Sequence, residues 1–522
     1  MSGAVSARYD VCILGAGMAG LTLARQLHGR APQLRIAIVE HRRFPVREAV
    51  HKVGESTVEI ASHYLSEDLN LRDHMAAEQL PKFGLRLFLR GAQAVTEDVS
   101  QYDEIGVKKI LPIPTFQLDR GRLENYLASG CVMSGADVLQ GTTVRAVDIN
   151  KGAHRVTVRD GAAEQTLRAR YLVDASGRRG WLRDQRDLAR PARHANQAVW
   201  FRVAGSFELD DWSGNDEWRT RCSGMSRRLS TNHFTGPGYW LWLIPLASDV
   251  TSVGLVFDPQ RVPLSAVSTH AKFLRWLEDE HPLVTSRLAG HAPLDFHALK
   301  DYAVACRQTF CEDGWMLSGD AGVFSDPFYS PGADFIAFAN GFITELIVGN
   351  LSAEHYRKFQ AYFLAFFSST LSLYRGQYGG FGDRNLMVIK TIWDYTYYWG
   401  PLSKLFFTRR YLDTDFMEAN QPVLLRAAGL NASMQRNFRR LSRSGQRVGG
   451  EGRFFDHHEL PIFHRLKHEL LQGDSDATGA QLASSVATLE SLVAGLSKIM
   501  ADLDHGARLP ALDKLGQLSE FA

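Results

Sequence analysis

Three glycines near the N-terminus stand at the spacing that dinucleotide-binding loops use. Gly15, Gly17 and Gly20 form a GxGxxG pattern. The first permits a tight turn, the second lets the backbone approach a pyrophosphate, and the third lets a helix pack closely on a strand. Amide groups at the start of that helix also attract phosphate. The pattern therefore predicts dinucleotide binding.

Three acidic residues follow short apolar runs that are typical of buried parallel strands. Glu40 lies 25 residues after Gly15 and is placed to accept hydrogen bonds from a ribose. Asp174 ends Tyr-Leu-Val-Asp, and Asp320 ends Trp-Met-Leu-Ser-Gly319-Asp. Together these acids favour a cofactor site over three unrelated polar caps on strands.

The positions around the glycines indicate a strand–helix–strand unit. Residues 9–14 and 34–39 have the apolar character of strands, and residues 21–27 have helical spacing. Between 194 and 299, alternating aromatic-rich segments predict a second sheet. From about residue 341 the pattern is helical, with a linker at 445–452 and an amphipathic helix at 480–503.

Composition limits the classes of function. The chain has 522 residues, 45% of them hydrophobic and 22% charged, which is typical of a globular protein. Its 59 basic and 57 acidic residues leave a net charge of +2, which argues against a general nucleic-acid binder. Five widely spaced cysteines without a CxxC pair predict neither disulfides nor zinc, so we expect a reducing cytoplasm. No segment predicts a membrane span.

The Asp174 turn and the Gly319-Asp320 motif resemble those of FAD-dependent hydroxylases over roughly residues 8–345. The resemblance implies that Gly319 and Asp320 contact the ribityl chain of FAD. It also implies that Arg120 contacts FAD; a solvated arginine at a helix start is the alternative.

The segment Trp240-Leu-Trp242-Leu-Ile244-Pro245 resembles the WxWxIP signature of flavin-dependent halogenases. The resemblance implies that these four named residues form a wall at the flavin, where the tryptophans discourage direct oxygen transfer to substrate. An aromatic face on a buried strand is the alternative. The turn Gly54-Glu55-Ser56-Thr57 resembles the turn that members carry near the flavin.

The same resemblance assigns an essential lysine to Lys82. It implies that reduced FAD and oxygen form a C4a-hydroperoxide, that halide attacks it, and that the resulting hypohalous acid reaches this lysine. A desolvated lysine has a lowered pKa and can hydrogen-bond to an oxidant or attack it. Lys52 is a competitor for the role, and an exposed strand lysine is the structural alternative.

One loop departs from the family pattern. The resemblance implies halide binding at Ser330 and Gly332, yet Pro331 stands between them and has no N–H to donate. Tyr329 replaces a glutamate of the tryptophan-halogenating branch, so free tryptophan is not the expected substrate.

Other patterns favour simpler interpretations. His464 and His468 share a helix face, but no familiar metal motif is present, so we expect no metal. Eight arginines between 168 and 193 indicate a solvated face, with docking of an acidic acyl carrier protein as the alternative. The aromatic cluster at 393–399 is interpreted as the core of a helix, with the lining of a substrate pocket as the alternative.

These observations predict an α/β protein with a Rossmann-type FAD-binding domain, an inserted β-sheet layer facing substrate and a helical C-terminal region. The expected boundaries are 1–190 and 301–345 for the two parts of the FAD module, 191–300 for the sheet and 346–522 for the helices.

The expected reaction is halogenation by chloride or bromide of an electron-rich aromatic such as a phenol or pyrrole, free or tethered to a carrier. FADH2 would come from a separate NAD(P)H-dependent flavin reductase. The rivals are a non-halogenating monooxygenase or reductase acting on an aromatic, polyene or lipid, and a non-catalytic flavin-binding partner.

Overall fold

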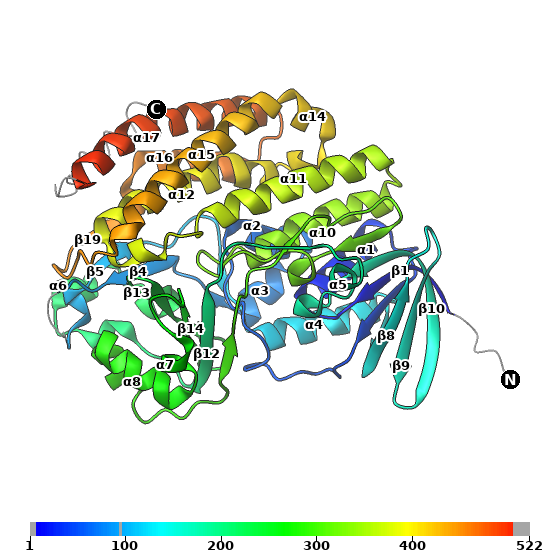
Figure 1. Ribbon diagram of the computed structural model, residues 1–522, viewed down its shortest axis with the longest axis horizontal. Helices are drawn as coiled ribbons and strands as arrows, with labels where there is room; N and C mark the ends of the chain where they lie inside the picture. Colours follow the sequence, from blue (N-terminus) through cyan, green and yellow to red (C-terminus); the bar gives the residue numbers. More distant parts are fainter. Residues whose placement is uncertain (1–6, 93–96, 505–522) are drawn as a thin grey trace. The chain divides into compact units, whose positions relative to one another are not determined.

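The computed structural model describes residues 7–92 and 97–504, and the chain divides into two compact units (Figure 1). The first unit is formed by Met1–Glu78, Leu118–Ala192 and Ala303–Ser368. The second is formed by Gln79–Gln117, Arg193–Tyr302 and Ser369–Ala522.

The first unit is built on a seven-stranded sheet. Its order is β7-β2-β1-β10-β9-β8, and β18 pairs with β10. Strand β1 runs parallel to both β2 and β10. A helix connects β1 to β2, as parallel pairing of consecutive strands requires. The strands are β1 (Arg8–Leu14), β2 (Ile36–Glu40), β7 (Asp137–Gln140), β8 (Thr142–Asp148), β9 (His154–Asp160), β10 (Ala163–Asp174) and β18 (Trp315–Leu317).

Helices complete this unit. Helix α1 contacts both α4 and α10 and connects β1 to β2. The residues on β1, β2, β10 and β18 that face the core are apolar and buried, which explains why these short runs form central strands. The helices are α1 (Met18–Arg30), α2 (Glu59–His63), α3 (Arg72–Glu78), α4 (Arg120–Met133), α5 (Trp181–Gln185), α10 (Gly332–Val348) and α11 (Ala353–Ser372), which ends beyond the boundary of the unit.

The second unit contains an eight-stranded sheet with the order β16-β12-β15-β14-β13-β4-β5-β19. Its central strands β13, β14 and β15 are buried along their whole length. The strands are β4 (Leu85–Leu89), β5 (Asp103–Gly106), β12 (Gln197–Ala204), β13 (Thr231–Gly236), β14 (Tyr239–Leu246), β15 (Val250–Phe257), β16 (His297–Leu299) and β19 (Phe454–Asp456).

The helices of this unit lie mainly in the C-terminal third of the chain. The longer ones are α8 (His270–Glu280), α9 (Pro282–Leu288), α12 (Arg384–Tyr397), α15 (Gln421–Leu441), α16 (Pro461–Gln472) and α17 (Thr478–Asp504). Helix α17 is long and apolar enough to cross a membrane by length and composition alone, and 44% of its apolar window is buried within the protein. A buried helix of a globular unit meets the same criterion, and α17 contacts α15 and α12.

The units divide the chain differently from the boundaries expected from sequence. The sequence predicts that residues 79–117 belong to the FAD module, but their strands β4 and β5 belong to the sheet of the second unit. Strand β4 pairs parallel with β13, and β5 pairs with β19 near the C-terminus. Strand pairing between distant segments assigns residues 79–117 to the second unit, and local periodicity in the sequence does not predict such pairing.

Candidate functional site

The glycine loop of the first unit has no room for side chains at two of its three glycines. Gly15 has φ +106°, and a Cβ placed on it would lie 2.5 Å from the carbonyl oxygen of Ala175. A Cβ on Gly20 would lie 2.0 Å from the carbonyl oxygen of Gly15. The loop turns sharply after β1, and α1 begins at Met18. This is the geometry that brings a helix N-terminus to a pyrophosphate.

Glu40 lies beside this loop at the end of β2. Its carboxylate accepts hydrogen bonds from the backbone N–H of Ala16 at 2.8 Å and of Arg42 at 3.0 Å. Both oxygens are therefore fixed at the end of the strand, where a ribose hydroxyl can reach them.

A buried carboxylate that the sequence analysis did not identify, Glu124, organises the cations around the loop. Arg120 pairs with it at 2.6 Å, Lys52 at 3.2 Å and His51 at 2.8 Å. The N–H of Met18 also donates to it, at 3.1 Å. Burial alone would raise the pKa of Glu124, but the charges of Arg120 and Lys52 and the His51 ring hold it well below its ordinary range.

The ion pair with Glu124 places Lys52 beside the glycine loop. Its ammonium lies 2.8 Å from the position that a Cβ on Gly17 would occupy. It is a cation at the phosphate-binding loop of the first unit, whereas Lys82 belongs to the second unit.

The two other strand-end acids differ in their roles. Asp174 accepts hydrogen bonds from the N–H groups of Ser176 and Leu182 at 3.0 and 2.8 Å, so it also supports the turn after β10. Asp320 lies after β18, in a short helical turn. Burial raises the pKa of Asp320, and the charges of Arg178, Arg120, Lys52 and Arg183 oppose that rise.

The turn around Glu55 and Ser56 is buried and attached to the segment that carries Arg120. The carbonyl of Glu55 accepts from the N–H of Leu118 at 2.8 Å. Arg120 donates to the carbonyl of Gly54 at 3.3 Å, and Gly54 has φ +98°. Glu55 and Ser56 are thus placed close to the cations of the glycine loop.

The loop predicted to bind halide leads directly into α10. Tyr329 and Ser330 both have left-handed backbone conformations, with φ +68° and +59°. Such strain in two consecutive non-glycine residues is characteristic of functional loops. The N–H of Ser330 donates to the carbonyl of Pro327 at 2.9 Å. Pro331 precedes the first helical residue, Gly332, at the N-terminus of this 17-residue helix.

The aromatic signature occupies β14 in the second unit. Trp240 and Trp242 lie on the same face of the strand, with ring centroids 5.6 Å apart. Their indole N–H groups donate to the Tyr378 hydroxyl at 2.9 Å and to the Ser252 hydroxyl at 3.1 Å. Ile244 shares their face by strand alternation.

Pro245 differs from the other three signature residues. Alternation along β14 places it on the opposite face, and there it lines a small cavity with Leu243 and Phe207. Trp240, Trp242 and Ile244 therefore share one face of β14, and Pro245 packs on the other.

Lys82 lies between the two-residue strand β3 (Leu80–Pro81) and β4, and the residue is only 3% exposed. The expected alternative of a solvated lysine therefore does not hold. Its neighbour is His233 on β13, which is also buried. Burial, followed by the charge of Lys82, lowers the pKa of His233 to about 3. The His233 ring packs edge-on against Trp240 with a centroid distance of 4.8 Å.

The backbone around Lys82 is held by hydrogen bonds from three other segments. Its own N–H donates to the carbonyl of Thr115 at 2.8 Å. The N–H of Phe83 donates to Leu229 at 2.9 Å, and the Phe83 carbonyl accepts from the Ser230 hydroxyl at 2.9 Å. The lysine therefore projects from a fixed support.

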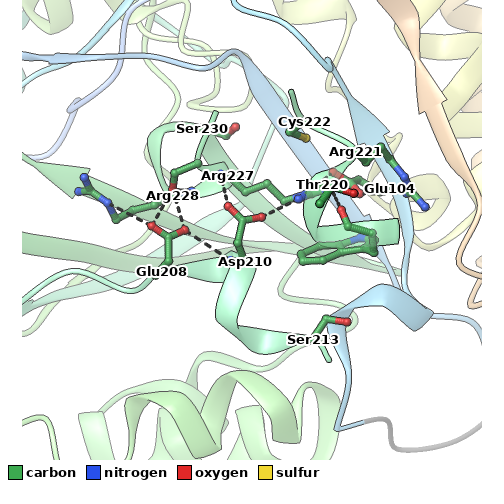
Figure 2. A network of polar contacts seen from close by, with 12 residues as sticks. Glu104, Glu208, Asp210, Ser213, Thr220, Arg221, Cys222, Arg227, Arg228 and Ser230 are labelled. Atoms are coloured by element: carbon green, nitrogen blue, oxygen red, sulfur yellow. Dashed lines mark hydrogen bonds and ion pairs between the residues drawn. The ribbon is translucent and has the colours of Figure 1, made fainter. Parts of the chain in front are cut away.

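A buried ion network adjoins the backbone segment that carries Lys82 and Phe83 (Figure 2). Glu104 on β5 pairs with Arg86 on β4 and, at 2.9 Å, with Arg227, and all three side chains are fully buried. Arg227 also pairs with Asp210 at 2.6 Å and lies over the Trp218 ring at 3.7 Å. Arg86 in turn donates to Ser230 at 3.2 Å, which connects the network to Phe83.

The first unit fits FAD. The glycine loop leaves space that side chains at Gly15 and Gly20 would fill. The carboxylates at the strand ends suit the hydroxyl groups of the ribose and the ribityl chain. The cations beside the helix N-terminus suit the pyrophosphate of a dinucleotide. Fold and site together define an FAD-binding oxidoreductase. In agreement, the profile of the family described as an FAD binding domain matches residues 8–235.

Comparison with known proteins narrows this class. The chain is 30% identical over 384 residues to the flavin-dependent halogenase chlA of Dictyostelium discoideum, covering 68% of this chain and 63% of that relative. It is 26% identical to a 1H-pyrrole-2-carbonyl-[peptidyl-carrier protein] chlorinase of Pseudomonas fluorescens, covering 66% and 77% of the two chains. The crystal structure of halogenase PltM has the same fold, with a TM-score of 0.65 at 16% identity and coverage of 93% and 96%.

These relatives and structures support the assignment of the chain to the flavin-dependent halogenases, and FAD is its cofactor. The chain spans less than two thirds of the length of the Dictyostelium relative.

Sequence patterns do not single out Glu124 of the first unit or His233 of the second unit. Glu124 lies four residues after Arg120, and this i,i+4 spacing on a helix is a signal that predicts their ion pair. His233 comes close to Lys82 only through the pairing of β13 with β4, for which the sequence carries no comparable signal.

Proposed function

We propose that this protein halogenates an electron-rich aromatic compound, such as a phenol or a pyrrole, with chloride or bromide. The observation that carries the proposal is the burial of Lys82 beside His233, whose ring packs against Trp240 of β14. Reduced FAD, supplied by a separate NAD(P)H-dependent flavin reductase, provides the activation of oxygen that oxidises halide to hypohalous acid.

The residues of the first unit bind and orient. Glu40 accepts hydrogen bonds from ribose, and Lys52 and Arg120 face the pyrophosphate. The halide is held at the start of α10, where the N–H of Gly332 and the helix dipole offer positive charge. Pro331 removes one donor from this place, and Ser330 contributes its hydroxyl.

Lys82 receives the oxidant. Its ammonium donates a hydrogen bond to the oxygen of hypohalous acid and so orients the electrophilic halogen toward the aromatic carbon. When that carbon is attacked, the ring takes the halogen, hydroxide leaves, and the ring proton is lost. His233 remains neutral at physiological pH because its pKa is about 3, so no second positive charge displaces Lys82.

The substrate is proposed to be tethered to a carrier protein. Two relatives are named for action on a pyrrole-2-carbonyl group attached to a peptidyl carrier protein. Tyr329 stands where the tryptophan-halogenating branch has its glutamate, which favours a phenol or pyrrole over free tryptophan. A reducing cytoplasm suits the five free cysteines.

The test requires no natural substrate. Purified protein receives FADH2 from a generic reductase, with oxygen and a reactive phenol, and bromide or chloride is added or omitted. The proposal predicts a halogenated phenol only when halide is present. Hydroxylated phenol or hydrogen peroxide alone, whatever the halide, would refute it and favour the monooxygenase.

A further inference from the structure

An arginine-rich surface in the second unit is formed by three separate segments. Helix α15 and the turn after it supply Arg436, Arg439 and Arg443, and two loops supply Arg193 and Arg375. We call these five residues the arginine surface. Arg193, Arg436 and Arg443 are exposed, and Arg375 and Arg439 are half-buried.

Direct contacts bring the segments together. The Arg439 guanidinium donates from Nε to the carbonyl oxygen of Arg375 at 2.8 Å. Its Cδ and Cγ atoms lie 3.3 Å from the position that a Cβ on Gly376 would take. Burial, followed by the charges of Arg439 and Arg193, lowers the pKa of Arg375. Burial, followed by the charges of Arg436 and Arg443, lowers the pKa of Arg439. The five cations therefore share one electrostatic environment.

This concentration of charge is not explained by local stability. Arg436 and Arg439 are three residues apart on α15, so like charges face each other along the helix. Arg443 adds a third positive charge in the turn that follows. Within residues 7–92 and 97–504, no carboxylate lies within ion-pair distance of Arg193, Arg436, Arg439 or Arg443. The helix dipole favours cations in the last turn of α15, but it gives no reason for Arg193 and Arg375 to join them.

The arginine surface adjoins an aromatic cluster that ends at the signature strand. Arg193 precedes His194, whose ring packs against Tyr374 and Tyr378 with centroid distances of 6.5 and 5.9 Å. The Tyr378 hydroxyl accepts the hydrogen bond from Trp240. A chain of contacts within this unit therefore connects the arginine surface to Trp240 of the signature strand.

The chemistry of the surface selects an acidic protein partner. Guanidinium groups bind carboxylates and phosphodiesters through paired hydrogen bonds. A membrane-binding surface would also present apolar anchors, but the exposed Leu425 of α15 lies eleven residues before Arg436, about three helical turns away. The net charge of +2 on the whole chain does not suit a nucleic acid.

We propose that the arginine surface docks an acidic carrier protein, whose phosphopantetheine arm delivers a tethered aromatic substrate toward the aromatic cluster beside Trp240. This inference rests on the proposed function and names the partner for its tethered substrate. Charge complementarity of this kind raises the rate of association and makes it sensitive to salt.

The test measures binding and turnover separately. The probe is an acidic acyl carrier protein loaded with a pyrrole-2-carbonyl thioester, and the free comparison is the same acyl group on N-acetylcysteamine. The variant Arg436→Glu/Arg443→Glu reverses two charges of the surface. The control Lys272→Glu/Arg275→Glu makes the same change of charge on α8.

We expect the surface variant to weaken carrier binding, measured by fluorescence anisotropy at low salt, by about tenfold or more, and the control to leave it within about twofold. The salt dependence of binding should become shallower in the surface variant only. Turnover of the carrier-bound thioester should fall in parallel, and turnover of the free thioester should stay constant.

Carrier binding that is undetectable, or equal in all three proteins, would overturn the docking inference. Halide-dependent oxidation of a freely diffusing thioether trap, measured in the same samples, reports separately on the proposed function. If the unmodified protein does not oxidise the trap, the proposed halogenase activity is refuted. The anisotropy measurement would still show whether the arginine surface binds the carrier.

Discussion

The buried ion network behind Lys82 makes a strong prediction about stability. Glu104 is fully buried between Arg86 and Arg227, which are fully buried themselves. Glu104→Gln preserves the shape of the side chain and removes its charge, so the two guanidinium groups lose their shared counter-ion. Breaking a buried pair in this way costs about 3–5 kcal/mol. Arg227 retains Asp210, so we expect the lower part of this range.

Urea denaturation followed by tryptophan fluorescence measures this effect, because all but Trp181 and Trp315 of the ten tryptophans lie in the second unit. The control is Glu208→Gln in the same network. Its side chain is 38% exposed, and it faces the like charge of Asp210, so we expect a change below about 1 kcal/mol. A Glu104→Gln variant within about 1 kcal/mol of the natural protein would show that the two arginines do not need this carboxylate.

The same residue sets a dependence on pH. Burial alone would raise the pKa of Glu104, but Arg86 and Arg227 hold it below its ordinary value of 4.5. A carboxylate with a lowered pKa stabilises the folded state above its unfolded pKa, and the stabilisation is lost as the pH falls through the folded pKa. We therefore expect the free energy of unfolding to decrease below about pH 4.5, and less steeply in Glu104→Gln.

Further predictions concern the cofactor, the aromatic strand and the halide. Gly20→Ala should abolish FAD binding, measured by visible absorbance of the purified protein, because its Cβ would meet the Gly15 carbonyl at 2.0 Å; Gly29→Ala on the same helix meets no atom within 4 Å and should bind FAD normally. Gly254→Ala would place a Cβ 2.1 Å from the Trp242 ring, and such overpacking costs about 1–3 kcal/mol. We expect it to lower the yield of halogenated phenol per FADH2 consumed, with FAD binding intact, and an unchanged yield would argue against Trp242 as a flavin wall. Pro331→Ser would add a backbone donor at the proposed halide site and should lower the apparent KM for bromide by about tenfold, the worth of one hydrogen bond to an ion. An unchanged KM would argue against halide binding by this loop.

Much of the first unit could be predicted from the sequence, because its signals are local. The GxGxxG spacing, the short apolar strands and the acids that end them all lie within segments of about ten residues. Gly15 and Gly20 have the crowded geometry that the pattern predicts. The parallel pairing of β1 with β2 follows from the helix between them.

Contacts between distant segments could not be predicted in the same way. Glu124 takes partners from residues 18, 51, 52 and 120, and only the pair with Arg120 has a local spacing. Strand alternation separates Pro245 from the tryptophans, although all of them belong to one signature. The burial of Lys82 depends on β13, about 150 residues further along the chain, because strand pairing over such separations leaves no local periodicity.

We propose above that Lys82 holds the oxidised halogen for the substrate. The most direct measurement compares Lys82→Met with the natural protein in one reaction that contains FADH2, oxygen, bromide, a phenol and a freely diffusing thioether trap. We expect the variant to keep halide-dependent oxidation of the trap and to lose at least about 100-fold of bromophenol formation, a typical contribution of one positioned catalytic group. Equal loss of both products would instead assign Lys82 to the oxidation of halide, and full retention of bromophenol formation would exclude it from halogen transfer.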